Sequence, residues 1–165
     1  MKDYQSFGPT EPVLWIKQTI GHACGLMAFL HSISNGVGMR DYITPGSKLD
    51  HLFQKAIHLP PKARSDLLYN SDFIESEHMN AAITGDSNVP SPEDPNELHF
   101  IAFVKSDDGN LWELNGGMPG PLDHGPLDSE EDVLSQKALD RTVRQFLSGV
   151  DTDIRHSIVA LGPAF

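Results

Sequence analysis

Apolar residues along the first half of the chain follow two patterns. Residues 12–16 form a short apolar run of β-forming residues, which predicts a buried strand. Residues 26–33 are apolar nearly all round a helix, which is typical of a helix inside a core. Residues 47–57, 61–69 and 72–83 carry helical spacing with suitable capping residues. This half therefore predicts one strand followed by several helices.

The next part of the chain changes from a polar loop to a hairpin. Residues 84–96 contain Pro90, Pro92 and Pro95 among polar residues, so we expect a mobile loop without a core of its own. Residues 98–104 and 111–114 are apolar and flank a turn containing glycine. This arrangement predicts an antiparallel hairpin.

The last third of the chain predicts a smaller set of elements. We expect a short strand around Leu122, a helix over residues 128–147 with Asp128 or Ser129 as its N-cap, and a closing strand over residues 154–161. The order of strand, helices, hairpin, helix and strand predicts an α+β fold with helices packed on a mostly antiparallel sheet. The length of 165 residues predicts a single domain.

Composition and charge narrow the function classes. The formal net charge of -11 repels a phosphate backbone and attracts a basic protein, so nucleic acid is not an expected ligand. No apolar run approaches the length of a membrane span, and residues 1–9 resemble neither a secretory signal nor a lipidation motif. We therefore expect a soluble monomer without membrane attachment, located in the cytoplasm or in both the cytoplasm and the nucleus.

The chain has one cysteine, Cys24, which excludes an internal disulfide and a cysteine-rich zinc site. The break at Gly21 places Cys24 at the first turn of the predicted buried helix. Unpaired N–H groups and the helix dipole favour a thiolate there, so Cys24 is a candidate nucleophile. The alternative is a cysteine that only fills the core, since free cysteine is among the most buried residue types.

Three further residues complete a candidate catalytic set. Gln18 lies at the end of the predicted strand, where its amide and the Cys24 N–H would form an oxyanion hole; alone, it would be an ordinary surface glutamine. His99 is the one histidine in a strongly apolar predicted strand, and Asn115, across the hairpin, would orient its ring. His22 is a rival base beside Cys24, although geometry rather than adjacency decides a base. The other histidines are interpreted as core or solvent-facing residues.

Three motifs resemble one family. The sequence Gln-Thr-Ile-Gly-His-Ala-Cys-Gly over residues 18–25 is similar to the nucleophile signature of ubiquitin carboxy-terminal hydrolases. Residues 99–103 resemble the segment that holds their base. Residues 111–116 and their continuation to residue 125 are similar to the family's Leu-Tyr-Glu-Leu-Asp-Gly segment. All three occur in the family's order, and the resemblance runs from about residue 12 to residue 161.

The resemblance implies a papain-like fold with a knotted backbone and a thiol hydrolase that releases adducts from the carboxyl end of ubiquitin without a cofactor or metal. Matched residue by residue, it implies Cys24 as nucleophile, His99 as general acid and base, and Gln18 as oxyanion donor. Residues 84–96 match the active-site crossover loop, which limits the leaving group, and their composition suits a gate.

Two departures from the family pattern bear on activity. The family has aspartate where this chain has Asn115, so a dipole replaces a charge beside the base; we expect a lower rate rather than none. Family members also carry several dozen residues before the equivalent of Gln18 where this chain has seventeen, so residues 1–165 are expected to form an amino-terminally shortened catalytic domain with an exposed sheet edge. His22, where the family usually has asparagine, is a smaller difference.

Three functions therefore stand beside one another. The first is a deubiquitinating thiol hydrolase that uses Cys24, His99, Asn115 and Gln18, with ubiquitin as substrate. The second is a catalytically weak or inactive ubiquitin-binding module, which Asn115 and the missing amino-terminal part favour. The third is an unrelated acyltransferase or peptidase with a similar residue set, which would act on small acyl donors or unfolded peptides without ubiquitin.

Overall fold

The computed structural model describes residues 3–86, 98–148 and 155–162. Its regular elements are, in chain order, α1 (Cys24–Asn35), a short 3-10 helix η1 (Met39–Tyr42), α2 (Lys48–Ile57), α3 (Pro61–Tyr69), α4 (Asp72–Ala82), β1 (Ala102–Lys105), β2 (Asn110–Leu114), β3 (Leu122–Pro126), α5 (Gln136–Arg141) and α6 (Val143–Ser148). The predicted α+β class with an antiparallel sheet is therefore confirmed.

Helices α2, α3 and α4 begin where the sequence predicts. The side chain of Ser47 accepts a hydrogen bond from the Asp50 N–H, and Ser71 does the same for Ile74, so each satisfies one free donor of a helix start. Pro61 opens α3, where its missing N–H costs nothing. In the described part of the chain no helix has the length and hydropathy that a membrane crossing requires.

The sheet has three antiparallel strands in the order β1-β2-β3. Ala102 pairs with Leu114 and Lys105 with Leu111, so the predicted hairpin is confirmed. Its turn contains Gly109 at φ +81, a conformation that glycine adopts without steric cost. β3 is the short strand expected around Leu122.

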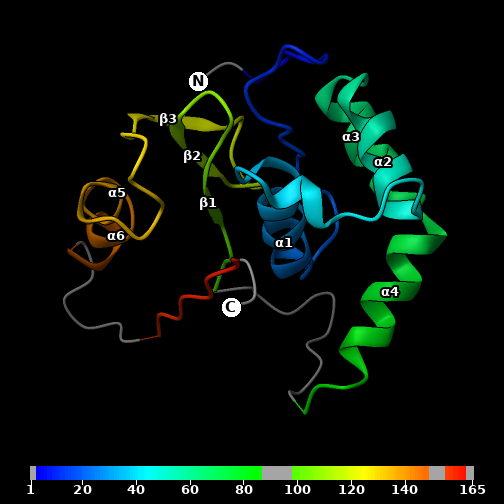
Figure 1. The fold of residues 1–165 in the computed structure, drawn as a ribbon. Helices are drawn as coiled ribbons and strands as arrows, with labels where there is room; N and C mark the ends of the chain where they lie inside the picture. Colours follow the sequence, from blue (N-terminus) through cyan, green and yellow to red (C-terminus); the bar gives the residue numbers. More distant parts are fainter. Residues whose placement is uncertain (1–2, 87–97, 149–154, 163–165) are drawn as a thin grey trace.

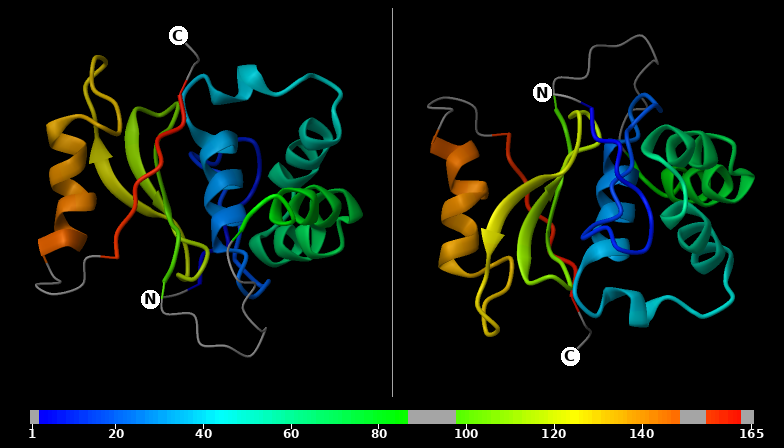
Figure 2. Two further views of the ribbon diagram at one scale, coloured as in Figure 1. Left: turned by 90° about the horizontal axis from the view of Figure 1, so that it is seen from below. Right: turned by 90° about the horizontal axis from the view of Figure 1, so that it is seen from above.

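The elements form layers around the sheet. Helix α1 packs against β1 on one face, and α5 and α6 lie across the other face (Figures 1 and 2). Helices α2, α3 and α4 lie beyond α1, on the side away from the sheet (Figure 2). Helix α1 is therefore central, which agrees with its predicted core position.

Residues 13–16 are buried, but the predicted strand over residues 12–16 is wrong, because this segment pairs with no strand of the described chain. Val13 and Trp15 pack against the sheet, while Leu14 and Ile16 pack against the helices. An extended segment buried on both faces has no polar side, which explains its unbroken apolar run.

Two other predicted strands are corrected, and one predicted loop is largely untested. The strand expected over residues 98–104 begins only at Ala102, which pairs with Leu114, the last residue of β2. Residues 155–161, expected within the closing strand, are exposed and form no strand in the described chain. Most of the loop predicted over residues 84–96 lies outside the described residues.

The single helix predicted over residues 128–147 is also wrong. Lys105 donates to the main-chain carbonyls of Asp128, Ser129 and Glu131, which holds this stretch as a turn. The helix begins later, with Ser135 rather than Asp128 or Ser129 as its N-cap. It ends at Arg141, and α6 follows at once.

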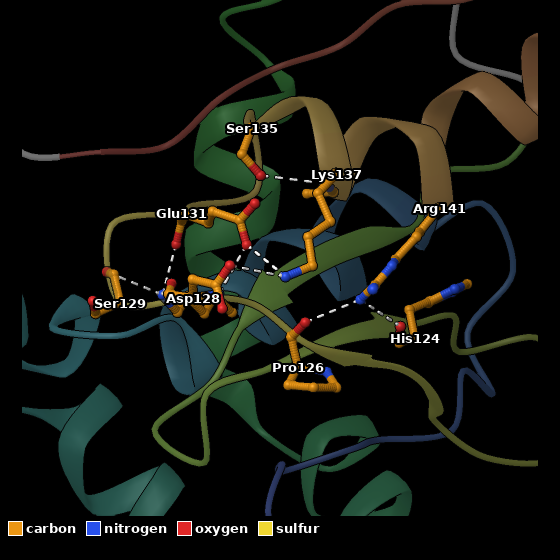
Figure 3. Close-up of polar contacts among 10 residues, drawn as sticks. His124, Pro126, Asp128, Ser129, Glu131, Ser135, Lys137 and Arg141 are labelled. Carbon is orange, nitrogen blue, oxygen red and sulfur yellow. Dashed lines mark hydrogen bonds and ion pairs between the residues drawn. The ribbon is translucent and has the colours of Figure 1, made fainter.

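Two basic residues of α5 hold the helix to β3 and to the turn that follows it (Figure 3). Lys137 forms ion pairs with Asp128 and Glu131. Arg141 donates to the carbonyls of His124 and Pro126 on β3. A six-residue helix has little intrinsic stability, so these contacts explain how α5 keeps its place on the sheet.

Candidate active site

Cys24 is the first residue of α1 and is buried, with 7% of its surface exposed. The residue before it, Ala23, has no side-chain acceptor to cap the helix. The first helical N–H that finds a main-chain acceptor is that of Met27, which donates to Ala23. The N–H groups before Met27 give the start of α1 a partial positive charge, which attracts an anion to the side of Cys24.

His99 and Asn115 are in contact, with 2.8 Å between His99 Nε2 and Asn115 Oδ1. Extending the β1–β2 register by three residues places His99 opposite Gly117, whose N–H donates to the same Oδ1 at 2.9 Å. A main-chain N–H can only donate, so this atom of Asn115 is the oxygen. His99 therefore donates through Nε2, which leaves Nδ1 as the ring nitrogen that Asn115 does not occupy.

The base segment lies beside the start of α1. A methyl group built on Gly25 would stand 3.8 Å from the ring of Phe100, the residue after His99. No hydrogen bond joins Cys24 to His99 or Gln18, all of which are described residues, and His99 is exposed. The structure thus brings His99 and Asn115 together and places them next to the cysteine helix without closing the final contact. Catalytic hydrogen bonds often tighten only in the substrate complex.

Gln18 is held at the end of β2. Its N–H donates to the Gly116 carbonyl at 2.9 Å, and its side-chain Nε2 donates to the Ile20 carbonyl at 3.0 Å. A methyl group on Gly116 would lie 2.9 Å from the Gln18 Cβ, so the close approach requires glycine. Among the described residues, Nε2 of Gln18 has no second hydrogen-bond partner.

His22 lies in the turn between Gln18 and Cys24 and has φ +55, the only positive φ of a non-glycine residue in the described ranges. Asparagine and histidine are among the residues that tolerate this left-handed conformation best. The backbone geometry of the turn is therefore enough to explain a histidine at position 22, and no role as a base is needed.

Sequence reasoning missed three buried polar side chains beneath the site. His31 and Asn35 of α1 and Arg64 of α3 hydrogen-bond the main chain of residues 14–16. The sequence allows His31 a place in the core or on the helix surface, and the structure places it in the core, fully buried. Its position seven residues after Cys24, on the buried side of the same helix, is the signal that could have singled it out. No sequence signal distinguishes Arg64.

Burial lowers the pKa of His31 from its usual 6.5 to about 4, against the opposing effect of the main-chain groups of Ile16 and Leu114. The ring is therefore neutral at physiological pH, and its Nε2 accepts the Ile16 N–H at 3.0 Å.

Acidification is expected to destabilise the fold through His31. Between pH 6.5 and 4 the unfolded chain binds this proton and the folded chain does not, so stability is full above pH 6.5 and falls as the pH drops toward 4. The difference in pKa corresponds to about 3 kcal/mol. Urea unfolding of the wild type and His31→Gln at several pH values measures this, because the variant lacks the contribution. An equal loss of stability in both proteins would contradict it.

No three His, Cys, Asp or Glu side chains converge to hold a metal ion in the part of the chain that the structure describes. The groups that the structure describes at this site are a thiol at a helix N-terminus, an imidazole hydrogen-bonded to Asn115, and a nearby side-chain amide.

Comparisons with known proteins agree on one family. The family model described as "Ubiquitin carboxyl-terminal hydrolase, family 1" matches residues 2–148. Ubiquitin carboxyl-terminal hydrolase isozyme L1 of Rattus norvegicus is 34% identical over 149 residues, which cover 90% of this chain and 63% of the relative. A probable ubiquitin carboxyl-terminal hydrolase of Dictyostelium discoideum is 31% identical over 152 residues, covering 92% of this chain and 58% of the relative.

The solved structure of the Trichinella spiralis UCH37 catalytic domain bound to ubiquitin vinyl methyl ester has the same fold. The TM-score is 0.63 at 19% sequence identity, over 91% of this chain and 66% of that chain. The chain spans less than two thirds of the length of the two curated relatives described above. On these matches and this fold, the chain belongs to the ubiquitin carboxyl-terminal hydrolase family 1.

Proposed function

We propose that this chain is a cysteine-type deubiquitinating hydrolase that cleaves amide, ester or peptide bonds at the carboxy-terminal glycine of ubiquitin. The observation that carries the proposal is the 2.8 Å contact between His99 and Asn115, set beside a helix that begins with the only cysteine. Ubiquitin as substrate is supported by the family and by the ubiquitin vinyl methyl ester bound to the structural neighbour.

In the proposed reaction, His99 Nδ1 takes the thiol proton of Cys24, and the thiolate attacks the carbonyl carbon of the terminal glycine. The oxyanion forms beside the Gln18 amide and the Cys24 N–H. The imidazolium then gives its proton to the leaving group as the scissile bond breaks and a thioester forms. Water, deprotonated by His99, hydrolyses the thioester and releases the ubiquitin carboxylate and the thiol.

The first test is hydrolysis of a fluorogenic ubiquitin carboxy-terminal amide by the purified chain. Because Cys24 is the only cysteine, iodoacetamide modifies no other thiol, so prior alkylation is expected to abolish turnover. Turnover that survives complete alkylation, or a folded chain that never turns over the substrate, would contradict the proposal.

A catalytically weak ubiquitin-binding module is the second candidate. It is favoured by the exposure of His99, by the missing contact between His99 and Cys24, and by Asn115 in place of the family's aspartate. This candidate predicts that the chain binds ubiquitin in calorimetry, while Cys24 reacts with iodoacetamide no faster than an ordinary thiol.

Replacing Asn115 by aspartate is expected to raise kcat for the ubiquitin amide by about tenfold, which corresponds to an activation barrier lower by about 1.4 kcal/mol. A carboxylate can accept the same bonds from His99 and Gly117 and adds a charge that stabilises the imidazolium. Asn115→Ala is the matched control and is expected to lower kcat, since neither bond remains. Steady-state kinetics decide the matter, and a slower aspartate variant would mean that Asn115 is the better orienter here.

Four other expectations from the sequence and the family resemblance remain proposals. These are a single domain over residues 1–165, a knotted backbone, residues 84–96 as a crossover loop that limits the leaving group, and a monomer acting in the cytoplasm or nucleus. Limited proteolysis of the loop with and without ubiquitin tests the third, since a loop that gates the site should be protected when ubiquitin binds.

A further inference from the structure

The main chain of residues 14–17, which leads to Gln18, is hydrogen-bonded by side chains. In a sheet, the main chain of a neighbouring strand would make these bonds. On the side of α1, Asn35 brackets Leu14, accepting its N–H at 2.5 Å and donating to its carbonyl at 3.1 Å. Two residues further on, the Ile16 N–H donates to His31 Nε2 at 3.0 Å. The spacing of these bonds is that of an edge in a β-ladder, with side chains of a helix as the partner.

The opposite side of the segment is bonded by α3. Arg64 donates to the Trp15 carbonyl at 3.0 Å, and the hydroxyl of Ser65 donates to the Lys17 carbonyl at 2.7 Å. Buried main-chain groups need partners, and these side chains supply them. The path of the chain up to Gln18 is therefore set by α1 and α3 together.

His31 is the contact nearest to Gln18 on the side of α1. It is fully buried, and burial lowers its pKa to about 4, so at neutral pH the ring is uncharged and its Nε2 can accept the Ile16 N–H at 3.0 Å. It is also seven residues after Cys24, about two turns along the same rigid helix. One helix thus carries the nucleophile at its start and, about 10 Å further along, the side chain that holds the oxyanion segment.

We propose that His31 is a positioning residue for the oxyanion donor, fixing Gln18 relative to Cys24 through the Ile16 N–H. This inference rests on the proposed hydrolase function, and it assigns His31 no contact with substrate. A shift of Gln18 would weaken stabilisation of the transition state while leaving the thiol and its base in place.

The test combines His31→Leu, which removes the acceptor, with Gln18→Ala, which removes the donor. His31→Leu is expected to lower kcat for the ubiquitin amide by about 10- to 100-fold with little change in KM, less than the roughly 100- to 1,000-fold cost of losing one oxyanion donor entirely. In the Gln18→Ala background, His31→Leu is expected to cause no further loss. The rate of Cys24 alkylation is expected to stay at the wild-type value, because alkylation forms no oxyanion.

The second measurement compares kcat of two variants whose side-chain amides differ in length, His31→Gln and His31→Asn. In His31→Gln the amide oxygen can reach the place of Nε2, so kcat is expected to recover most of the loss, whereas the shorter His31→Asn is not expected to recover it. If His31→Leu does not fold, the proposal is tested by comparing kcat of His31→Gln with that of His31→Asn. Ile74→Ala on α4 is the control, since it removes a buried side chain of the core that also contains Ile16 without touching the polar contacts, and its kcat is expected to stay near wild type.

Equal losses from His31→Leu with and without Gln18 would overturn the proposal, because His31 would then act on the fold in general. Equal activity of the Gln and Asn variants would overturn it as well. The side-chain amide resonances of Gln18 and the exchange rate of the Ile16 N–H are measured in the same proteins. If the wild type shows no turnover, the hydrolase proposal fails. The positioning contact is still supported if the Gln18 resonances and the Ile16 N–H exchange rate change in His31→Leu and not in Ile74→Ala. If neither changes in His31→Leu, the positioning proposal is overturned.

Discussion

Replacing His99 by glutamine is expected to lower kcat for hydrolysis of a ubiquitin carboxy-terminal amide by about 1,000-fold or more. Glutamine can still hydrogen-bond Asn115 but cannot take a proton from the Cys24 thiol or give one to the leaving group. The result is measured by steady-state kinetics on protein whose thermal unfolding matches the wild type. Ubiquitin binding is expected to persist, since the substitution removes a proton carrier from an exposed position rather than a core side chain.

His22→Asn is the matched control for this prediction. His22 is the rival histidine beside Cys24, and asparagine tolerates its positive φ of +55, so the turn should keep its shape. Its kcat is expected to stay within a few-fold of the wild type. A large loss in His22→Asn together with a small loss in His99→Gln would reverse the two roles.

Replacing Arg64 by leucine is expected to destabilise the fold by about 3 to 5 kcal/mol, because it leaves the Glu11 carboxylate buried without its partner. The two side chains are 0% and 4% exposed, and Arg64 also donates to the carbonyls of Ala56 and Trp15. Burial, followed by the hydrogen bond to Glu11, raises the pKa of Tyr4 to about 12, so this hydroxyl stays protonated beside the carboxylate at neutral pH. Urea unfolding at neutral pH measures the loss.

The exposed pair Lys62–Asp66 on the same helix provides the control, with side chains 86% and 57% exposed. Lys62→Ala is expected to cost less than about 1 kcal/mol, since water and salt screen exposed pairs. The double variant Glu11→Leu, Arg64→Leu is expected to recover part of the loss of the single variant, because no unpaired charge remains buried. If Arg64→Leu and Lys62→Ala lowered the free energy of unfolding by similar amounts, the buried pair would matter no more to stability than the exposed one.

Local patterns were enough to predict the parts of the candidate site that are close in sequence. The hairpin spacing between His99 and Asn115 predicted their contact, because an antiparallel register follows from the turn and the alternation of the strands. The glycine break before Cys24 predicted a helix that starts there. Both features depend on fewer than twenty residues of chain.

Other elements could not be predicted from local patterns. The apolar run at residues 12–16 predicted burial correctly and its partners wrongly, because those partners are side chains from helices as much as 49 residues away. The helix predicted over residues 128–147 is interrupted because Lys105, from a distant strand, bonds the carbonyls of its first turn. In both cases a long-range polar contact overrode a local preference.

The sequence by itself determined the chemistry available to this protein: one cysteine at a helix start, a histidine and an asparagine across one hairpin, and a glutamine before the turn. Only the tertiary structure decided how those groups are held, with His31, Asn35 and Arg64 bonding the main chain that leads to Gln18. The physical reason is that hydrophobic pattern determines which segments leave water, whereas the hydrogen-bond partners of a buried main chain depend on which distant side chains packing brings beside it.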